Sequence, residues 1–330
     1  MNMYDLTVLI PTYNRKERLT QTLDCLSKQT NRSFQIVITD NCSDYDVNKL
    51  IQQCDEDLRS RTKLIRRPYN IGSSANITMI LLECESKWAW LLGDDDYPLP
   101  EAVETIYQNM NDNIGAMHFS VLDMQRYLSP DCRVKTLYEF IDLYHSWLHD
   151  KHPIVNLQGD LIFMSNKVYN MDIVRPYVGM SIEYSYSKIG QLIPIFRMLE
   201  EQTGEFLISD VEIVKSLIAA NDHWNIQKIL YGMTSFTYVP FPSLSKRQRI
   251  RLNDVVMFKY TYVMKNYILD GQKNWQYTDT LYHTIYKRIL SPFSRLVFRS
   301  VAVCMQIGPL KNLMRKLLIK IEERRKAKHE

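Results

Sequence analysis

Three consecutive carboxylates, Asp94, Asp95 and Asp96, follow an apolar run at residues 88–92. Like charges at this spacing repel one another, so a buried strand that ends this way is expected to have a cation nearby. Mg²⁺ and Mn²⁺ prefer carboxylate oxygens and usually bridge them to phosphate. The alternative is a helix start, with Asp at the N-cap and Glu101 in the first turn. That alternative explains one aspartate, whereas metal or phosphate chemistry explains all three.

Alternating strands and helices are expected to position these carboxylates. Such alternation predicts an α/β fold, with a mostly parallel sheet covered by helices on both faces. Ligands bind beyond the carboxyl ends of the strands in such sheets. The polar residues 11–14, 40–43 and 94–96 should therefore gather at one edge. The expected strands are residues 7–10, 34–39, 63–65, 87–92 and 115–121, and the expected helices are residues 15–28, 47–57 and 75–84.

The composition is that of a soluble globular chain. Of the 330 residues, 45% are hydrophobic and 24% are charged, which is enough for a large core in one or two domains. The six cysteines form no C-x-x-C pair and no zinc-ligand spacing, so we expect reduced thiols in a cytoplasmic protein. No apolar run reaches the ~18–20 residues of a membrane-spanning helix.

Four motifs occur in order along the N-terminal part of the chain. Residues 8–15 read VLIPTYNR, residues 38–44 read ITDNCSD, residues 70–76 contain NIG and a further Asn, and residues 93–96 read GDDD. Together they resemble the inverting family 2 glycosyltransferases, whose GT-A fold is a Rossmann-like twisted sheet with flanking helices. Within that family the chain looks similar to bacterial surface-polysaccharide transferases, including the abequosyltransferase-like group. The resemblance spans residues 6–125 and fades beyond Arg126.

The resemblance implies a nucleotide-sugar site at the carboxyl edge of the sheet. Asp40 is similar to the family carboxylate that accepts the N3–H of uracil. Thymine has that N–H and cytosine lacks it, so UDP-sugars or, less often, dTDP-sugars are the expected donors. The alternative role for Asp40 is an Asx-turn or a helix cap. The loop before the helix at 75–84 offers N–H groups that suit a phosphate or ribose. The implied binding residues are Pro11, Thr12, Tyr13 (for stacking), Asp40, Asn70, Gly72, Asn76, Asp94 and Asp95.

The resemblance also makes residues 94–96 a D-x-D metal site. Asp96 would be the direct ligand of Mn²⁺ or Mg²⁺, Asp94 would contact ribose or the metal through water, and Asp95 would contact the donor sugar. The metal would neutralise the departing nucleoside diphosphate. His223 is a candidate further metal ligand, with a solvated loop histidine as the alternative. The usual family string is D-x-D-D, and Gly93 stands at its first position here, which leaves the roles of the aspartates open.

An inverting transferase needs one carboxylate opposite the leaving group to take the proton of the acceptor hydroxyl. Family members commonly carry it in a Glu-Asp pair, which this chain lacks at a suitable place. Glu183, which lies 87 residues after Asp96, and Asp160 are the two candidates; Glu183 could instead be a surface residue beside tyrosines. The basic run at residues 246–251 could hold diphosphate oxygens or form a solvated face.

The C-terminal segment is strongly basic. Residues 285–330 carry 12 Lys and Arg against 3 Asp and Glu, whereas the rest of the chain has 29 basic and 34 acidic residues. Basic amphipathic helices of this kind bind anionic membrane surfaces; packing on the body or an oligomer contact is the alternative. We therefore expect a GT-A domain at residues 1–225 with a donor half at 1–125 and an acceptor half at 126–225, a helical extension at 226–284, and membrane-associating helices at 285–330, broken at Gly308-Pro309.

The function expected from this resemblance is metal-dependent, inverting sugar transfer to a hydroxyl of a bacterial surface glycan, such as lipopolysaccharide or capsule, or of a lipid-linked acceptor. The protein would be peripheral at the inner face of the cell membrane, with a homo-oligomer left open. Nucleic acid is not an expected partner, because the body is net acidic. One rival is a nucleotidyltransferase, although residues 11–14 do not resemble its Gly-rich loop. The other is a catalytically inactive relative that serves as a membrane assembly module.

Overall fold

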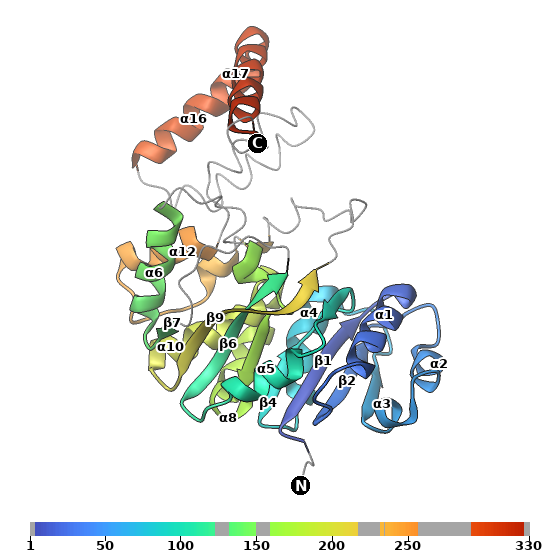
Figure 1. Cartoon of the computed structure of the whole chain (residues 1–330). Coiled ribbons are helices and arrows are strands. Elements are labelled where there is room, and N and C mark those ends of the chain that lie inside the picture. Colours follow the sequence, from blue (N-terminus) through green and yellow to red (C-terminus); the bar gives the residue numbers. More distant parts are fainter. Residues whose placement is uncertain are drawn as a thin grey trace. The chain divides into compact units, whose positions relative to one another are not determined.

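The computed structural model of the chain describes residues 4–122, 132–149, 159–216, 232–233, 235–256 and 292–326 (Figure 1). The chain divides into two compact units, Met1–Ser243 and Leu244–Glu330. The domain boundaries expected after residues 225 and 284 both fall outside the described residues.

The N-terminal β-α-β repeats build a parallel part of the sheet. β1 (Leu6–Thr12) runs parallel to β2 (Phe34–Asp40) on one side and to β4 (Trp88–Leu91) on the other, and β2 runs parallel to β3 (Thr62–Arg66). α1 (Lys16–Ser27) connects β1 to β2. The carboxyl ends of these parallel strands lie at one edge of the sheet, which is the arrangement that the sequence predicted.

Beyond β4 the sheet becomes mixed. Its strands follow the order β3-β2-β1-β4-β8-β6-β9-β5, with β7 paired to β9. β8 lies antiparallel to both β4 and β6, whereas β6 and β9 are parallel. The sheet is therefore parallel where it carries the polar clusters of the N-terminal motifs and mixed elsewhere. The remaining strands are β5 (Asp96–Pro98), β6 (Ile114–Leu122), β7 (Cys132–Val134), β8 (Lys167–Asn170) and β9 (Glu205–Ser216).

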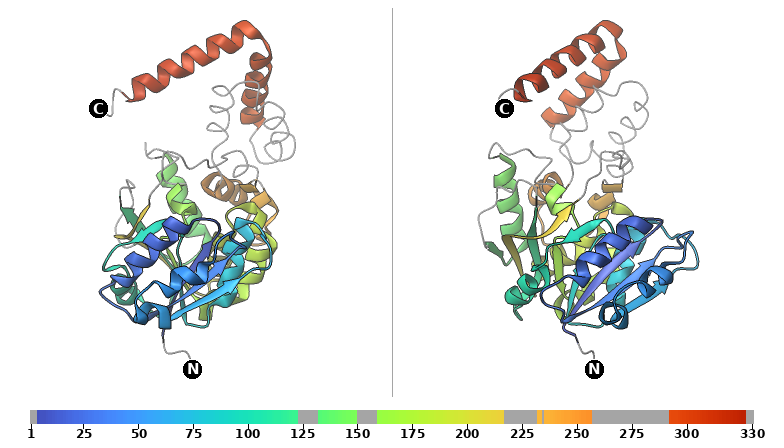
Figure 2. Two further views of the ribbon diagram at one scale, coloured as in Figure 1. Left: turned by 90° about the vertical axis from the view of Figure 1, so that its right-hand side faces the viewer. Right: turned by 45° about the vertical axis from the view of Figure 1, so that its right-hand side comes forward.

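Helices cover both faces of this sheet (Figures 1 and 2). Alternate residues of β1, namely Leu6, Val8 and Ile10, are fully buried in an apolar cluster that also contains Leu19 and Leu23 of α1. The two-residue period of a strand directs these side chains to one face and thereby fixes α1 over β1. The other α-helices among the described residues of this unit are α2 (Val47–Gln52), α3 (Glu56–Ser60), α4 (Ser73–Met79), α5 (Ala102–Asn109), α6 (Leu137–His149), α8 (Met171–Val174), α9 (Val178–Glu183) and α10 (Ile193–Glu201).

Three local predictions differ from the structure. The segment 47–57 forms two helices rather than one, because the Asp55 carboxylate caps the N-terminus of α3 and starts a new helix there. The segment 75–84 forms α4 and a following 3-10 turn. The alternative that the aspartates begin a helix is wrong, because Asp96 enters β5 and α5 begins only after its N-cap, Glu101.

The C-terminal unit contains α12 (Lys246–Val256), α16 (Pro292–Gln306) and α17 (Gly308–Lys326). The last two helices are separated where the sequence predicted the break. They contact each other through a small apolar cluster of Met305 with Val301, Met314 and Leu318. Other large apolar side chains of α17 are exposed, among them Leu310, Leu313, Leu317 and Ile321. Within the described residues, no helix combines the length and apolarity needed to cross a membrane.

Candidate active site

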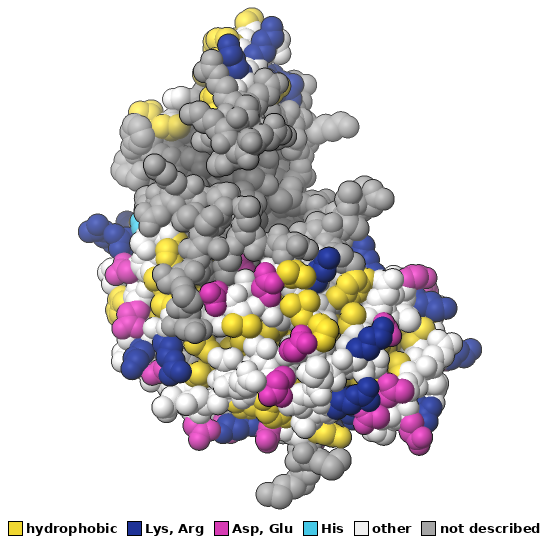
Figure 3. Space-filling model, in the orientation of Figure 1, with side chains coloured by type: hydrophobic (Ala, Val, Ile, Leu, Met, Phe, Trp, Pro, Cys, Tyr) yellow, Lys and Arg dark blue, Asp and Glu magenta, His cyan; other side chains and the backbone are white. Residues whose placement is uncertain are grey.

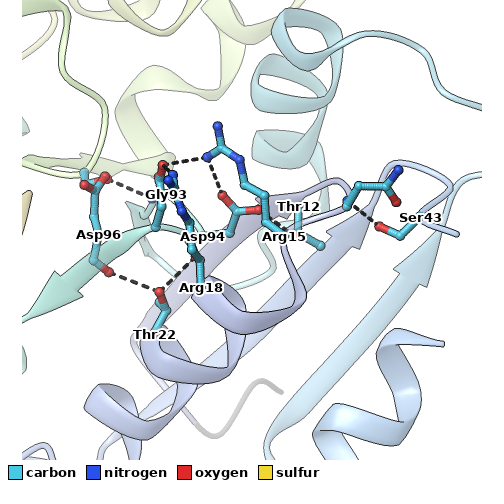
Figure 4. A network of polar contacts seen from close by, with 11 residues as sticks. Thr12, Arg15, Arg18, Thr22, Ser43, Gly93, Asp94 and Asp96 are labelled. Atoms are coloured by element: carbon cyan, nitrogen blue, oxygen red, sulfur yellow. Dashed lines mark hydrogen bonds and ion pairs between the residues drawn. The ribbon is translucent and has the colours of Figure 1, made fainter. Parts of the chain in front are cut away.

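The carboxyl ends of β1, β2 and β4 bring the polar motifs together (Figure 4). Thr12 Oγ1 donates to Asp94 Oδ2 at 2.7 Å, and the Asn41 N–H donates to the Thr12 carbonyl at 2.9 Å. The Asn14 N–H donates to Ser43 Oγ at 2.9 Å. Residues from three motifs that are far apart in the sequence therefore form one cluster at this edge.

Two arginines at the start of α1 contact the aspartates (Figure 4). Arg15 Nη1 lies 3.0 Å from Asp94 Oδ1 and 2.7 Å from Asp95 Oδ2, and Arg18 Nη1 lies 2.9 Å from the same Asp95 oxygen. Burial raises the pKa of Asp94 to about 6, although Arg15 and Thr12 act in the opposite direction. Asp94 is thus a buried carboxylate whose two oxygens are both already in polar contacts.

Asp96 has a different environment. It is 4% exposed, its Oδ2 accepts a hydrogen bond from Ser165 Oγ at 2.5 Å, and it pairs with Ser216 across β5 and β9. Burial first, and then the negative charge of Asp95, raises the pKa of Asp96 to about 7. Among the described residues, no Lys or Arg forms an ion pair with Asp96, so its negative charge is stabilised only by hydroxyl groups.

Hydroxyl groups outside the motifs hold the loop that carries the aspartates. Ser165 Oγ accepts the Gly93 N–H at 2.8 Å while it donates to Asp96, so one hydroxyl joins both ends of the loop. Trp90 Nε1 donates to the Ser165 carbonyl at 2.7 Å. Thr22 of α1 donates its hydroxyl to two backbone carbonyls of the same loop, at 3.1 and 3.3 Å.

Sequence reasoning missed these supporting residues, and only some of them left a signal in the sequence. Arg15, Arg18 and Thr22 are three and four positions apart, so they share one face of α1, and that spacing was visible in the sequence. Ser165 gave no comparable signal, because it reaches the loop through the long-range pairing of β8 with β4.

Asp40 is fully buried at the end of β2. Its Oδ1 accepts the Ser43 N–H at 2.9 Å, and its Oδ2 lies 2.5 Å from Arg66 Nη1. The Ser43 contact is the kind of local turn bond that the sequence left as the alternative. The Arg66 guanidinium also donates to the Ser43 carbonyl at 2.7 Å. A nucleobase that donated its N–H to Asp40 would therefore have to displace Arg66. Nearby, Pro11 is buried at the end of β1 and Tyr13 is 42% exposed.

The loop before α4 is held by Asn70 of its own motif and by Asn41 of the motif that follows β2. Asn70 Oδ1 accepts the Gly72 N–H and the Asn41 amide, both at 2.8 Å. Gly72 has a φ of 88°, where a side chain would strain the backbone. Asn76 is 2% exposed and donates to the Thr39 carbonyl at 3.0 Å. Asn76 therefore fastens α4 to β2.

The two candidate bases lie in different places. Glu183 ends α9 and is exposed, and none of the described contacts joins it to the aspartate loop. Asp160 is 5% exposed; its Oδ1 accepts from Asn166 Nδ2 at 3.0 Å, and its Oδ2 lies 3.1 Å from His118 Nε2. Asp160 is thus part of a buried polar network. His223 lies outside the described residues.

A divalent metal fits this loop only with ligands from elsewhere. In the described part of the chain, no group of three or more His, Cys, Asp or Glu side chains is placed to hold a metal ion. Mg²⁺ in phosphate-binding sites, however, takes one or two carboxylates and completes its shell with phosphate oxygens and water. Asp96 fits such a role because it is a buried carboxylate without a cationic partner among the described residues. Asp94 fits it once its contact with Arg15 is released.

Comparison with known proteins identifies a family match in the N-terminal part of the chain and several relatives. Residues 7–129 match the family described as Glycosyl transferase family 2. An uncharacterized glycosyltransferase of Haemophilus influenzae is 28% identical over 198 residues, which cover 59% of each protein. The GalNAc(5)-diNAcBac-PP-undecaprenol beta-1,3-glucosyltransferase of Campylobacter jejuni is 26% identical over 110 residues, 33% of this chain and 36% of that enzyme. The chain therefore spans less than two thirds of the length of either relative.

The fold is similar to that of S. aureus TarS 1–349. The TM-score is 0.63 at 12% identity, with 97% of this chain and 91% of the TarS chain covered. The TarS complex with UDP-GlcNAc gives a TM-score of 0.64 at 13% identity, with 97% and 92% covered. At this level of identity the similarity establishes the fold alone, and it confirms the GT-A-type α/β fold that the sequence predicted.

Proposed function

We propose that the protein is a metal-dependent, inverting glycosyltransferase of family 2 that uses a UDP-sugar, from the premise that residues 7–129 match that family. The observation that carries the proposal is the position of Asp96. Among the described residues this buried carboxylate has only hydroxyl partners for its charge, and it lies beside Asp94 at the edge of the sheet where ligands bind in such folds. A cation that bridges these carboxylates to a diphosphate would supply the missing positive charge.

Asp96 would hold Mn²⁺ or Mg²⁺ directly, and Asp94 would hold it directly or through water. When bound, the metal neutralises the negative charge of the departing nucleoside diphosphate. The raised pKa of Asp96 supports this role, because a carboxyl group that tends to bind a proton in the buried loop would exchange that proton for the cation. Asp95 would contact the donor sugar, and His223 stays a candidate further ligand.

The nucleotide would lie at the ends of β1 and β2. The Tyr13 ring is exposed enough to stack on a base, and Asp40 would accept the N3–H of uracil after Arg66 moves away. Thymine could use the same contact, so a dTDP-sugar is the second choice. The loop at Asn70 and Gly72 would contact the ribose or phosphate, and the Gly72 N–H would have to leave Asn70 Oδ1 to take part. TarS, which has a similar fold, was crystallised with UDP-GlcNAc.

Inversion would follow from a single displacement at the anomeric carbon. A base takes the proton of the acceptor hydroxyl, the hydroxyl oxygen attacks the anomeric carbon, and the nucleoside diphosphate leaves. Glu183 is our first candidate for the base, because its exposed carboxylate is accessible to an acceptor. Asp160 is the second candidate; its contacts with Asn166 and His118 would have to open for it to take a proton.

The acceptor would be a bacterial surface glycan or its lipid-linked precursor, as in lipopolysaccharide or capsule synthesis. The Campylobacter jejuni relative is named for an undecaprenol-linked acceptor, which supports this choice. The exposed apolar residues of α17 and the surrounding lysines support peripheral binding at the inner face of the membrane. Assignment to the abequosyltransferase-like group rests on the motif resemblance.

Calorimetry with UDP and Mn²⁺ tests the proposal. The wild-type protein should bind UDP in a metal-dependent manner, and Asp96→Asn should lose that dependence and turnover while it stays folded. Asp24→Asn, which changes an exposed residue of α1, is the matched control. Metal-independent UDP binding by the wild type, or normal turnover by Asp96→Asn, would remove the mechanism. Metal-dependent binding of UDP without hydrolysis or transfer of any nucleotide sugar would favour the inactive assembly module.

A further inference from the structure

One guanidinium group links two of the three aspartates. The same Arg15 nitrogen contacts Asp94 Oδ1 and Asp95 Oδ2, and the second Asp94 oxygen accepts the Thr12 hydroxyl (Figure 4). Asp94 therefore has no oxygen without a polar contact. A metal ion that approached Asp94 in this arrangement would meet a fixed positive charge at hydrogen-bond distance from the carboxylate that it needs, and two cations so close repel each other strongly.

The Arg15 side chain can move while its backbone stays in place. Its side chain is 37% exposed, whereas the preceding residue is held by contacts on both sides. Asn14 adopts a φ of 52°, its N–H donates to Ser43 Oγ, and its side-chain oxygen accepts the Asp44 N–H at 2.8 Å. Arg15 is thus a long, charged side chain whose backbone is held in place, at the edge of the sheet where the diphosphate would bind.

We propose that Arg15 is an exchangeable counter-ion that makes metal binding depend on the nucleotide. Without a donor, its guanidinium neutralises Asp94 and Asp95 and disfavours a metal. When a nucleoside diphosphate arrives, the guanidinium turns to the phosphate oxygens, which it can bind in a bidentate manner, and Asp94 becomes available to the cation. The inference rests on the proposed function, because it needs a diphosphate donor and a metal at this loop.

Arg18 differs from Arg15 in the contacts that matter here. It contacts Asp95 but has no described contact with Asp94, so it would keep Asp95 in place while Arg15 moves. Arg15 is therefore expected to couple the two ligands, and Arg18 is expected to position Asp95.

Titration with Mn²⁺, followed by electron paramagnetic resonance, and with UDP, followed by calorimetry, tests the coupling. In the wild-type protein, saturating UDP should tighten Mn²⁺ binding, within the range of about 5- to 150-fold that is usual for linked sites. Arg15→Ala should bind Mn²⁺ alone about tenfold more tightly than the wild type and bind UDP more weakly when Mn²⁺ is present, so the coupling should shrink. Arg15→Gln keeps a shorter polar side chain without the charge and should behave in the same way.

Lys16→Ala is the matched control, because it removes one positive charge from the same turn of α1 at an exposed position. It should leave the coupling at the wild-type value. Wild-type coupling in both Arg15 variants would overturn the inference and leave the proposed function intact. Weaker Mn²⁺ binding without UDP in both variants would overturn it as well. A wild-type protein that binds neither UDP nor Mn²⁺ would instead contradict the proposed function itself.

Discussion

At the scale of single residues, three adjacent aspartates differ because their neighbours differ. In the part of the chain that the structure describes, Asp95 contacts two arginines, Asp94 contacts one arginine and a threonine, and Asp96 contacts hydroxyl groups only. The desolvation of a charged carboxylate costs free energy. Ion pairs offset this cost for Asp94 and Asp95, whereas hydrogen bonds alone offset it for Asp96 among the described residues. This difference makes Asp96 the residue at which a cation or a proton would have the largest effect.

We predict that Asp96 makes the metal-free protein less stable as the pH rises. The pKa of its carboxyl is about 7 in the folded state against 3.8 as the usual value, so the folded protein holds a proton that the unfolded chain has lost. The resulting stabilisation is fully present below about pH 4 and is lost as the pH rises through about 7, with a slope of at most ~1.4 kcal/mol per pH unit. Asp94 acts in the same direction, up to about pH 6.

Denaturant unfolding in the presence of a chelator, between pH 5 and 8, measures this effect as the difference between the wild type and Asp96→Asn. The difference cancels the titration of the other carboxylates. The wild type should lose stability relative to the variant as the pH rises, and Mn²⁺ with UDP should reduce that loss. Parallel stability curves for the two proteins would show that Asp96 titrates normally.

At the scale of elements, the sequence predicted those parts of the fold that depend on local periodicity. The β1-α1-β2 unit, β3 and β4 lie where apolar patterns placed them, and the rule for parallel sheets located the motifs at one edge. The antiparallel pairing of β8 with β4 and β6 was not predictable, because it depends on contacts between residues some 50 to 80 positions apart. Ser165, which follows from that pairing, was therefore missed.

Side-chain partners within the site were harder to predict than backbone positions. The motif at residues 40–43 located Asp40 at the end of β2. It did not predict the Arg66 guanidinium that contacts Asp40, because nothing in the sequence of β3 indicated a contact between these two side chains. The aspartate string likewise gave the position of the loop, but not which carboxylate contacts a cation. These contacts depend on which side chains the tertiary structure brings within hydrogen-bond distance.

We predict that Gly72→Ala is destabilising for a backbone reason alone. No atom lies within 4 Å of the position that a Cβ would take, but the φ of 88° is unfavourable for alanine, so a cost of about 1 kcal/mol is expected. UDP binding should weaken as well, because the loop before α4 would relax. Gly179→Ala is the matched control: it also has open space, lies within α9 and lacks a positive φ, so it should be neutral or stabilising. Equal unfolding midpoints for the two variants would contradict this account.

At the scale of the whole molecule, charge is distributed differently in the two units. Acidic and basic side chains are interspersed over the visible face of the N-terminal unit (Figure 3), which is typical of a solvated surface. The last 46 residues instead carry a local balance of +9. In α17, exposed apolar side chains at Leu310, Leu313 and Leu317 recur every three to four residues and so share one face, whereas Met314 and Leu318 pack against α16.

This exposed face predicts binding to anionic vesicles, which a double substitution should weaken. Leu313→Ser with Leu317→Ser removes apolar surface that is 54% and 53% exposed, so the packing between α16 and α17 should survive while membrane affinity falls at least about tenfold. Flotation with vesicles that contain phosphatidylglycerol measures the affinity, and raised salt should lower it further because each basic residue near the surface contributes about 1 kcal/mol.

Tyr138→Ser with Val211→Ser is the matched control, because both residues are exposed apolar positions of the N-terminal unit, at 38% and 43%. Vesicle binding by this control should equal that of the wild type. If α17 instead contacts a second copy of the chain, the α17 variant should change the sedimentation of the protein in the absence of lipid and leave flotation unchanged. The apolar face is then an oligomer interface, and the acceptor must be reached without help from this helix.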